Sequence, residues 1–534
     1  MRIAASAREK LQFSFAATTS TSSLRPTKSG QLTPHRAQVT EELRVAVAST
    51  AALPPEPLRL SALDAQWRLL IFSDSDDGGA AGGNTNVPPP FASAVASLRA
   101  SLAETLTRFP PLAGRIVHLP DTGDAAFDCT AAGVAGGVRF IAAEMIGVDA
   151  ARLAGEEEHD AEVFRRLVPE LDAGELPAET MAAQVTRLRG GMAIGVAVHH
   201  AVVDGRSVWR FLEAWAAACR GGGEDDDDDV EPPPTFDRAA IELPSGEELA
   251  RAVLRKHAPD LPKVRRPISN CSSRAAGDLK YVDCVPLGKA FPECRTTHGK
   301  VKPRWTTAAV AGRLVQPNLS RRTFSITARD MQCLKHRIAD VSPTGHAATS
   351  PSSFIAVASL AWVSFVHAKH RAGNVSPNDE VYLSFFADCR TRLNPPPGDH
   401  YFGVCISGCL ARVTARDLLA ENGVGVAAVL VAEQVRRAML DPLAGWDWRS
   451  TVKEVDKDRV VILSGSNKFS AYEVTDFGWG LPARTELVTM NHDGQVVLVA
   501  GKKGGDSDGG MQASVSLHPA HMGMYKSYFL SYFR

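Results

Sequence analysis

The sequence predicts an α/β protein of two domains, each with a mixed β-sheet and flanking helices. Strand-like and helix-like segments alternate along both halves of the chain, which is typical of layered α/β folds. A length of 534 residues is sufficient for two or more domains of ordinary size. Between the halves, residues 221–234 combine an acidic run with prolines. Such a run can bind a metal, but it is more typical of a solvated linker.

Composition places the chain among soluble globular proteins and excludes several classes of function. Hydrophobic residues make up 44% of the sequence, charged residues 22%, and the formal net charge is −1. This balance gives no electrostatic basis for binding nucleic acid or an acidic membrane surface. No apolar run reaches the roughly 18 residues that a membrane-spanning helix needs. The 9 cysteines include no Cys-x-x-Cys motif, which favours reduced thiols in a compartment such as the cytoplasm.

The first 40 residues differ in composition from the rest of the chain. They are basic and rich in serine and threonine, with Glu9 as the only acidic residue. This composition is like that of a plastid transit peptide, but we expect residues 1–40 to be a disordered extension. The first domain then spans residues 41–220 and begins with a strand at Leu43–Val47.

Local signals predict the other elements of the first domain. In Phe91–Phe109, apolar residues at 91, 95, 98, 102 and 106 lie on one helix face, and prolines at 110 and 111 end the helix. The Asp, Gly, Asn and Pro residues of 74–90 predict a loop before it. Further predicted elements are strands at Arg115–His118, Val138–Ala142 and Ala183–Leu188 and a helix at Ala161–Leu167.

The centre of the first domain is the stretch Gly191–Arg206. Larger apolar residues alternate with small ones from Met192 to Val198, which predicts a buried strand. Arg189-Gly190-Gly191 predicts a tight hairpin turn before this strand. Apolar residues at spacings of three and four then predict a helix, at Val208, Phe211, Leu212 and Trp215.

Two polar residues lie between this strand and this helix. His200 follows the strand, and Asp204 comes four residues later, directly before Gly205. A histidine held at the end of a buried strand is suited to proton transfer. The residues alone leave another interpretation open, because such a histidine is often a core residue and such an aspartate is often a helix N-cap. On an extended chain His199 points to the opposite side and is predicted to be a packed or edge residue.

The second domain is predicted at residues 321–534, after a crossover linker at 221–320. Thr327 and Asp330 have the spacing of a capping box before a helix. Ser352 or Ser353 can cap the apolar helix predicted at Phe354–Val366. Strands are predicted at Thr323–Ile326, Val381–Phe386, from Tyr401 onward, Val460–Leu463, Glu486–Met490, Gln495–Ala500 and Gln512–Leu517.

A second motif, Asp476-Phe-Gly-Trp-Gly480, stands near the end of the chain. Together with the His-x-x-x-Asp-Gly pattern of 200–205, it resembles the BAHD family of plant acyltransferases, which use coenzyme A thioesters. The resemblance covers roughly residues 40–260 and 315–534. Three further segments fit the family in the same order, namely Leu60-Ser-x-x-Asp64, Phe109-Pro-Pro-Leu-Ala-Gly-Arg115, and Asp388-Cys-Arg-Thr-Arg392 leading to Tyr401-Phe-Gly403.

The resemblance implies the two-domain fold of chloramphenicol acetyltransferase, with an active-site channel between the domains. It also implies that His200 is the general base, which takes the proton from the acceptor and returns it to the leaving thiolate. A positioned base of this kind contributes about 10²–10⁴ in rate, because a neutral hydroxyl attacks a thioester poorly. In this family the aspartate turns away from the channel and pairs with an arginine. Asp204 and Gly205 would then support the catalytic loop, with Arg390 or Arg392 as the partner.

The resemblance gives the second motif a structural role. Gly478 and Gly480 would shape a turn after Asp476, and Trp479 would fill the channel wall, with its indole N–H as a candidate donor to the developing oxyanion. The letters Asp-Phe-Gly also form the metal-binding turn of kinases. The chain lacks a Gly-rich phosphate loop and a His-Arg-Asp catalytic loop, so we reject a kinase.

No metal site is predicted. Adjacent histidines on a strand do not easily reach one ion, so His199, His200 and Asp204 are poor candidates for a shared metal. Cys405 and Cys409 lie in an apolar, strand-like run and are predicted to be core residues. We therefore expect no metal and no resident cofactor, with acyl-CoA as the cosubstrate and a monomer as the working state.

Few residues bear on the substrate. Val404 departs from the family's more usual Asn, yet Cys405 resembles the branch that transfers malonyl or hydroxycinnamoyl groups to anthocyanins and other phenolic glycosides. Lys468 stands where many members have Arg; it could meet a coenzyme phosphate or a malonyl carboxylate, or it could be a surface lysine. We predict acyl transfer from acyl-CoA to a hydroxyl of a phenolic or flavonoid glycoside. The alternatives are an N-acyltransferase of the same family and a catalytically silent ligand-binding protein on the same fold.

Residues 264–312 form an atypical insert in the crossover linker. They are basic, irregular and without helical or strand periodicity. The family has a crossing segment near this place, but this one is longer than the resemblance implies. We expect much of the insert to lie outside the packed fold. A non-coding segment retained in the transcript would give a stretch of this kind.

Overall fold

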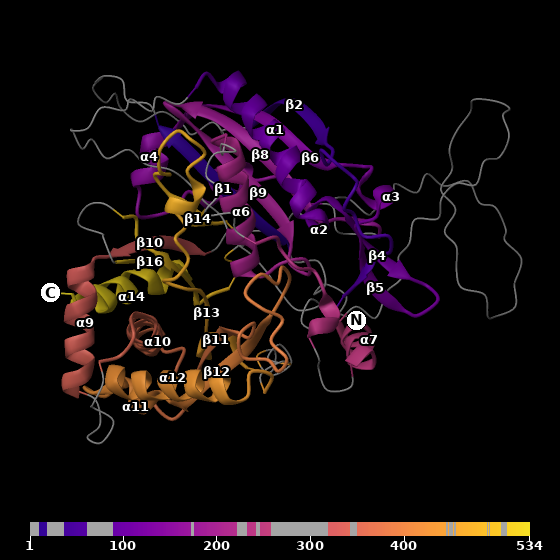
Figure 1. Ribbon diagram of the computed structural model, residues 1–534. Helices are drawn as coiled ribbons and strands as arrows, with labels where there is room; N and C mark the ends of the chain where they lie inside the picture. Colours follow the sequence, from indigo (N-terminus) through magenta and orange to yellow (C-terminus); the bar gives the residue numbers. More distant parts are fainter. Residues whose placement is uncertain are drawn as a thin grey trace, which may run out of the picture.

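Two six-stranded sheets and one four-stranded sheet form the framework of the protein in a computed structural model (Figure 1). The predicted α/β fold with two domains and mixed sheets is confirmed. Residues 61–64 and 264–312, which were singled out from the sequence, lie outside the described part. The structure describes residues 10–18, 37–60, 89–171, 176–221, 232–241, 246–257, 319–341, 350–444, 447, 452, 455–488, 490, 492–503 and 510–533.

The first half of the chain is built on a sheet with the strand order β14-β1-β9-β8-β6-β2. Its strands are β1 (Lys10–Thr18), β2 (Gln38–Val45), β6 (Val138–Asp149), β8 (Met181–Arg189), β9 (Gly191–His199) and β14 (Thr485–Leu487). Neighbouring strands are antiparallel except β6 and β8, which are parallel. The predicted hairpin is present as β8 and β9, and Gly190 between them has a φ of 76°. Because β9 lies inside the sheet, its residues 192–198 are all buried.

The expectation that residues 1–40 are a disordered extension is wrong for Lys10–Thr18 and for residues 38–40, which begin β2. This segment forms β1 and pairs with β9 along its whole length, from Lys10 opposite His199 to Thr18 opposite Gly191. Within Lys10–Thr18, Leu11, Phe13 and Phe15 alternate with polar residues, which is the period of a strand. The average composition of the first 40 residues concealed this short alternation.

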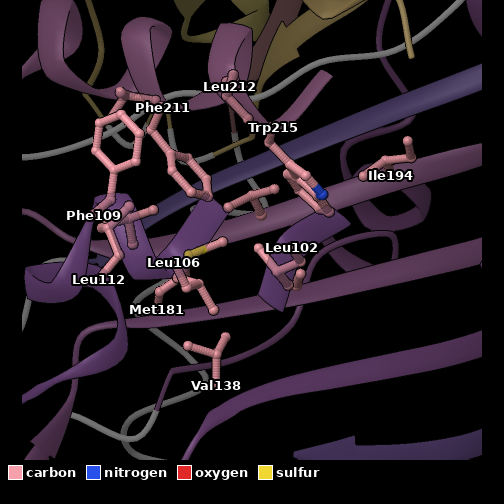
Figure 2. Close-up of a cluster of buried hydrophobic side chains, with 14 of the residues drawn as sticks. Leu102, Leu106, Phe109, Leu112, Val138, Met181, Ile194, Phe211, Leu212 and Trp215 are labelled. Carbon is pink, nitrogen blue, oxygen red and sulfur yellow. The ribbon is translucent and has the colours of Figure 1, made fainter. Parts of the chain in front are cut away.

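Two helices pack on the first sheet and create its core. They are α1 (Phe91–Arg108) and α6 (Gly205–Cys219). Figure 2 shows Leu102 and Leu106 of α1 facing Phe211 and Trp215 of α6 above the strands. The indole Nε1 of the fully buried Trp215 donates to the carbonyl of Leu98 at 3.1 Å, so its polar atom is satisfied. Each fully buried large apolar side chain of this kind contributes about 1.5–3 kcal/mol relative to exposure.

A smaller sheet with the order β3-β5-β4-β7 lies beside the first one. Its strands are β3 (Leu58–Arg59), β4 (Arg115–Leu119), β5 (Asp124–Asp128) and β7 (Ala178–Glu179). The remaining helices of this half are α2 (Pro110–Ala113), α3 (Ala131–Val134), α4 (Ala150–Gly155), α5 (Ala161–Arg166), η2 (Arg238–Ala240) and α7 (Gly246–His257). Arg251 of α7 donates to Asp124 of β5 at 2.8 Å, which attaches this helix of the crossover linker to the smaller sheet.

The second half is built on a sheet with the order β10-β16-β15-β13-β11-β12. Its strands are β10 (Ser320–Ile326), β11 (Glu380–Asp388), β12 (Ile406–Thr414), β13 (Val460–Gly465), β15 (Gln495–Ala500) and β16 (Met511–Leu517). The pairs β11–β13 and β13–β15 are parallel and the others antiparallel. The helices are α9 (Ala328–Val341), α10 (Ser353–Arg371), α11 (Ala415–Leu419), α12 (Gly423–Leu440) and α14 (Pro519–Ser531), with short turns η3 (Lys457–Arg459) and η4 (Glu473–Thr475).

Both predicted helix caps in this half are confirmed. The hydroxyl of Thr327 accepts from the Asp330 backbone N–H at 3.1 Å, and the Asp330 carboxylate accepts from the Thr327 backbone N–H at 3.0 Å. The Ser352 hydroxyl accepts from the Ile355 N–H at 3.3 Å at the start of α10. Caps of this type contribute about 1 kcal/mol each.

Each half contributes a short backbone segment to the sheet edge of the other half. Strand β14 belongs to the second half by sequence but pairs with β1 of the first sheet. In return, Glu158 of the first half forms a bridge with Arg322 of β10, at the edge of the second sheet. The predicted strand at Glu486–Met490 is therefore displaced to Thr485–Leu487, where it pairs with the sheet of the other half.

Candidate active site

The turn between β9 and α6 carries the predicted catalytic histidine. Strand β9 ends at His199, and the N–H of Val202 donates to the carbonyl of His199 at 3.0 Å to form the turn. His200 lies in this turn with 2% of its surface exposed. The helix predicted from Val208, Phe211, Leu212 and Trp215 is present as α6 and begins at Gly205. The histidine is therefore placed between a central strand and a buried helix, both of which are fixed by packing.

His199 and His200 have different environments, as the strand geometry predicts. His199 is half-buried, and its ring Nδ1 accepts from the backbone N–H of Ala201 at 3.2 Å. Its own backbone N–H donates to the carbonyl of Thr180 at 2.7 Å. In the part of the chain that the structure describes, no three His, Cys, Asp or Glu side chains gather into a group that could hold a metal.

Asp204 is both a helix cap and one half of a buried ion pair. It is 1% exposed, and its Oδ1 accepts from the Ser207 N–H of α6 at 3.0 Å. Its Oδ2 accepts from the Cys405 N–H of the second half, also at 3.0 Å. The guanidinium of Arg390 lies 2.8 Å from Oδ2 through Nη1 and 2.9 Å from Oδ1 through Nη2. The two interpretations left open by the sequence, a cap and a pair with an arginine, are thus true together.

Arg390 is the arginine that makes this pair, and it is fully buried. Its Nε donates to the carbonyl of Tyr401 at 3.0 Å, and its Nη2 donates to the carbonyl of Gly403 at 2.8 Å. Burial lowers the pKa of Arg390, but the carboxylates of Asp204 and Asp388 outweigh it, so the pKa lies above its ordinary value. The arginine therefore stays charged and ties the N-terminus of α6 to the segment after β11.

Arg392, the other candidate from the sequence, does not make this contact. It is exposed, and its Nη1 donates to the carbonyl of Asp388 at 3.0 Å. Sequence reasoning missed Ser207, whose hydroxyl donates to the Gly403 carbonyl at 3.0 Å and accepts from Arg390 at 2.9 Å. No local pattern indicates these contacts, because Gly403 and Arg390 lie 196 and 183 residues away along the chain.

The Asp476–Gly480 motif forms a tight turn around one carboxylate oxygen. The Oδ1 atom of Asp476 accepts from the backbone N–H groups of Gly478 at 2.8 Å, Trp479 at 3.1 Å and Gly480 at 3.1 Å. Gly478 and Gly480 have φ values of 95° and 97°, which residues with a side chain rarely adopt. The motif thus needs Asp476 as the acceptor for three backbone N–H groups and needs the two glycines for their positive φ angles.

The same turn packs on the C-terminal end of α6. Phe477 is 4% exposed and meets the ring of Trp215 edge to face at 5.3 Å. Arg220, at the end of α6, donates to the carbonyl of Asp476. Trp479 is half-buried and stacks on Phe477 at 6.2 Å. Helix α6 thus contacts the second half at both ends, at Asp204 and at this turn.

Lys468 lies after β13 on the surface of the second half. It is exposed, and its backbone N–H donates to the Ser466 hydroxyl at 3.1 Å. Within the described segments no carboxylate forms an ion pair with its ammonium group. The position is therefore accessible to an anionic ligand.

The sequence profile of the Transferase family matches residues 83–270 and 305–531 of this chain, which is most of its length. The chain belongs to this family, the BAHD acyltransferases. The resemblance inferred from the motifs is therefore confirmed, and with it an acyl-CoA-dependent O-acyltransferase that uses acyl-CoA as its cosubstrate.

Curated relatives match over most of their length. A malonyl-CoA:anthocyanidin 5-O-glucoside-6''-O-malonyltransferase of Arabidopsis thaliana is 28% identical over 450 residues, which is 80% of this chain and 84% of that protein. A phenolic glucoside malonyltransferase 1 of the same plant is 29% identical over 454 residues, or 82% of this chain and 86% of that protein.

Solved structures confirm the fold. Vinorine synthase superposes with a TM-score of 0.60 at 17% identity, covering 93% of this chain and 98% of its own. The F. sporotrichioides protein TRI101, solved with coenzyme A and T-2, gives 0.53 at 15% identity, covering 83% and 91%. No helix in the described ranges is long and apolar enough to cross a membrane.

Proposed function

We propose that this acyltransferase moves a malonyl or hydroxycinnamoyl group from coenzyme A to a sugar hydroxyl of a phenolic or flavonoid glycoside, with His200 as the general base. The observation that carries the proposal is the placement of His200 on the turn that Asp204 and Arg390 fix between the two halves. The substrate class is supported by two curated relatives, which by name transfer malonyl groups to glucosides.

The chemistry follows from this arrangement. The ring of His200 takes the proton of the acceptor hydroxyl while the oxygen attacks the thioester carbonyl carbon. The tetrahedral intermediate then breaks the carbon–sulfur bond, and the imidazolium returns the proton to the leaving thiolate. The products are an ester and free coenzyme A. Asp204 does not touch the reacting atoms in this scheme, because both of its oxygens are taken by Arg390 and backbone N–H groups.

Burial of the histidine is part of the proposal. With 2% of His200 exposed, we infer that the side chains around the ring move when a substrate binds. Catalytic hydrogen bonds in enzymes without substrate are often long or poorly aligned and tighten on binding. Because bound acyl-CoA then covers the ring, we expect saturating acyl-CoA to slow the modification of His200 by diethyl pyrocarbonate, as followed by peptide mass spectrometry.

The proposal involves no resident cofactor or metal, and it places the monomeric enzyme in the cytoplasm. Cysteines support a reducing compartment, since the six in the described part of the chain are all free thiols. Burial raises the pKa of Cys129 and Cys389 to about 12, so these thiols are not reactive nucleophiles.

A donor screen tests the function directly. Purified protein is incubated with malonyl-, coumaroyl- and acetyl-coenzyme A and with phenolic glucosides, and released thiol is measured. We expect transfer with at least one acidic or aromatic donor and a loss of about 10²–10⁴ in His200→Ala at unchanged thermal stability. Equal activity in His200→Ala would show that another group is the base.

Amine acceptors are the second candidate class. An agmatine coumaroyltransferase of Arabidopsis thaliana is 25% identical over 392 residues, or 71% of this chain and 74% of that protein. Including agmatine in the same screen separates ester from amide formation. A protein that binds acyl-coenzyme A and glucosides but releases no thiol would instead be a silent binding protein on this fold.

A further inference from the structure

Arg238 is a buried arginine in the segment that crosses between the two halves. It is 8% exposed and lies in the short helix η2, whose first turn is capped by Asp237. Thr235, three residues earlier, is fixed to the second half: its N–H donates to the His400 carbonyl at 2.9 Å, and its carbonyl accepts from the Phe402 N–H at 2.8 Å. The crossing segment therefore delivers Arg238 to a defined place.

Two guanidinium groups hold three successive carbonyls of the segment Tyr401–Gly403. Arg390 donates to the first and third, Tyr401 and Gly403, at 3.0 and 2.8 Å. Arg238 donates through Nη1 to the one between them, Phe402, at 3.0 Å. The ring of Tyr401 lies 5.7 Å from both guanidinium carbons. The guanidinium carbon of Arg238 also lies 5.2 Å from the centre of the ring of Phe127, which belongs to β5 of the first half.

Both arginines also reach the turn that carries His200. Arg390 binds Asp204 at the end of the turn. Arg238 donates through Nη2 to the carbonyl of Val202 in its middle, at 3.4 Å. The turn is thus attached to one fixed segment, Tyr401–Gly403, at two points through two different arginines.

We propose that Arg238 is a positioning residue for acyl transfer. Its guanidinium bridges the carbonyls of Val202 and Phe402 and thereby sets the orientation of His200. The inference rests on the proposed role of His200. Arginine suits this position because its planar guanidinium donates to three carbonyls, those of Phe236, Phe402 and Val202, while it lies over two rings. A lysine offers only one compact ammonium group. A loop that is displaced by about 1 Å costs on the order of 10²-fold in rate.

Kinetics of three variants test this role. For Arg238→Ala we expect kcat to fall about 10- to 100-fold, with KM for acyl-CoA and for the acceptor changed less than about threefold. Arg238→Lys should recover part of kcat, because it restores one of the donors. Arg210→Ala is the matched control, since Arg210 is also buried and donates to Pro232 of the crossing region and, at 2.9 Å, to the His400 carbonyl of the second half. We expect its kcat to remain within about threefold of wild type.

Amide hydrogen exchange gives a readout that does not require activity. Exchange of the peptide that covers residues 199–206 should become faster in Arg238→Ala than in Arg210→Ala at matched thermal stability. An Arg238→Ala enzyme with unchanged kcat and unchanged exchange in 199–206 overturns the proposal, as does an equal kcat loss in Arg210→Ala. If wild type transfers no acyl group but exchange responds as expected, the function proposed above fails while the link from Arg238 to the turn stands.

Discussion

Asp204 and Arg390 form a two-point ion pair that joins the start of α6 to the segment after β11. The four atoms involved lie 2.8 and 2.9 Å apart, and both side chains are at most 1% exposed. Taking two charges out of water is costly, and the cost is offset only when the remaining lone pairs and protons are also bonded. Ser207, Cys405 and the carbonyls of Tyr401 and Gly403 fulfil that condition. The pair therefore fixes the geometry of the His200 turn.

Removing one partner of this pair should cost both stability and activity. Asp204→Ala leaves a buried guanidinium without its carboxylate and removes the cap of α6, so we expect a loss of about 3–5 kcal/mol in the free energy of unfolding. Urea denaturation followed by fluorescence measures this change. Acyl transfer should fall by more than the loss of folded protein explains, because the His200 turn is no longer held by the ion pair.

A nearby surface pair provides the control. Arg206 bonds to Asp388 and Asp399 at 3.1 and 3.0 Å, and its side chain is 42% exposed. Exposed pairs contribute at most about 1 kcal/mol, so Arg206→Ala should unfold close to the urea concentration of wild type. Equal destabilisation by both substitutions would show that burial of the Asp204 pair is unimportant.

The turn at Asp476 predicts a different pattern, in which the acceptor atom matters and the charge does not. Asp476→Asn keeps an oxygen that accepts the three backbone N–H groups, whereas Asp476→Ala leaves them to water. We expect a loss of about 1–3 kcal/mol for Asp476→Ala and much less for Asp476→Asn, measured by thermal unfolding. A kcat that collapses in Asp476→Asn at normal stability would instead assign the charge a role in the reaction.

Much of the site was predictable because its signals are local. The alternation of Met192–Val198, the glycine turn before it and the spacing of apolar residues after it predict β9, the hairpin and α6 as observed. The alternative between Arg390 and Arg392 was not decidable in this way. The two are two residues apart in a turn, and only the path of the chain after β11 decides which one is buried.

Contacts between distant segments were the part that the sequence concealed. Arg238 reaches the His200 turn only because Thr235 is bonded to His400, far along the chain. Helix α12 (Gly423–Leu440) was also missed. It has glycine at its first and third positions, and it packs against α10, so it lacks a clear amphipathic period. Strand β14 pairs with a sheet of the other half, and the alternation of residues along a strand does not indicate which sheet it joins.

Acid should destabilise the contact between the two halves at Glu486. This fully buried carboxylate lies 3.2 Å from His159 and 3.0 Å from Arg484, and it accepts from the hydroxyl of Ser514 at 2.9 Å. Burial raises the pKa of Glu486, but His159 and Arg484 outweigh it and lower the pKa to about 2. Because the folded pKa lies below the unfolded value of about 4.3, the stabilisation is complete above that value and is lost as the pH falls toward 2.

The corresponding experiment compares unfolding free energies between pH 6 and pH 3. Wild type should lose on the order of 2 kcal/mol from this group across that range, and Glu486→Gln should start less stable but show a flatter acid limb. Glu56→Gln, at an exposed position, should follow the wild-type curve. Parallel acid limbs in wild type and Glu486→Gln would mean that this carboxylate does not contribute to the pH dependence.

Lys468 distinguishes between two ways of recognising the donor. If its ammonium group meets a malonyl carboxylate, Lys468→Ala should raise KM for malonyl-coenzyme A about fivefold and leave KM for acetyl-coenzyme A unchanged, since an exposed charge pair contributes about 1 kcal/mol. If it meets a coenzyme phosphate, both KM values should rise, and both effects should shrink at high salt. Lys457→Ala, at another exposed lysine, controls for net charge. Unchanged KM for both donors would show that Lys468 is a surface residue without a role in binding. Loss of its ammonium group would weaken the binding of any phosphate or carboxylate that it contacts.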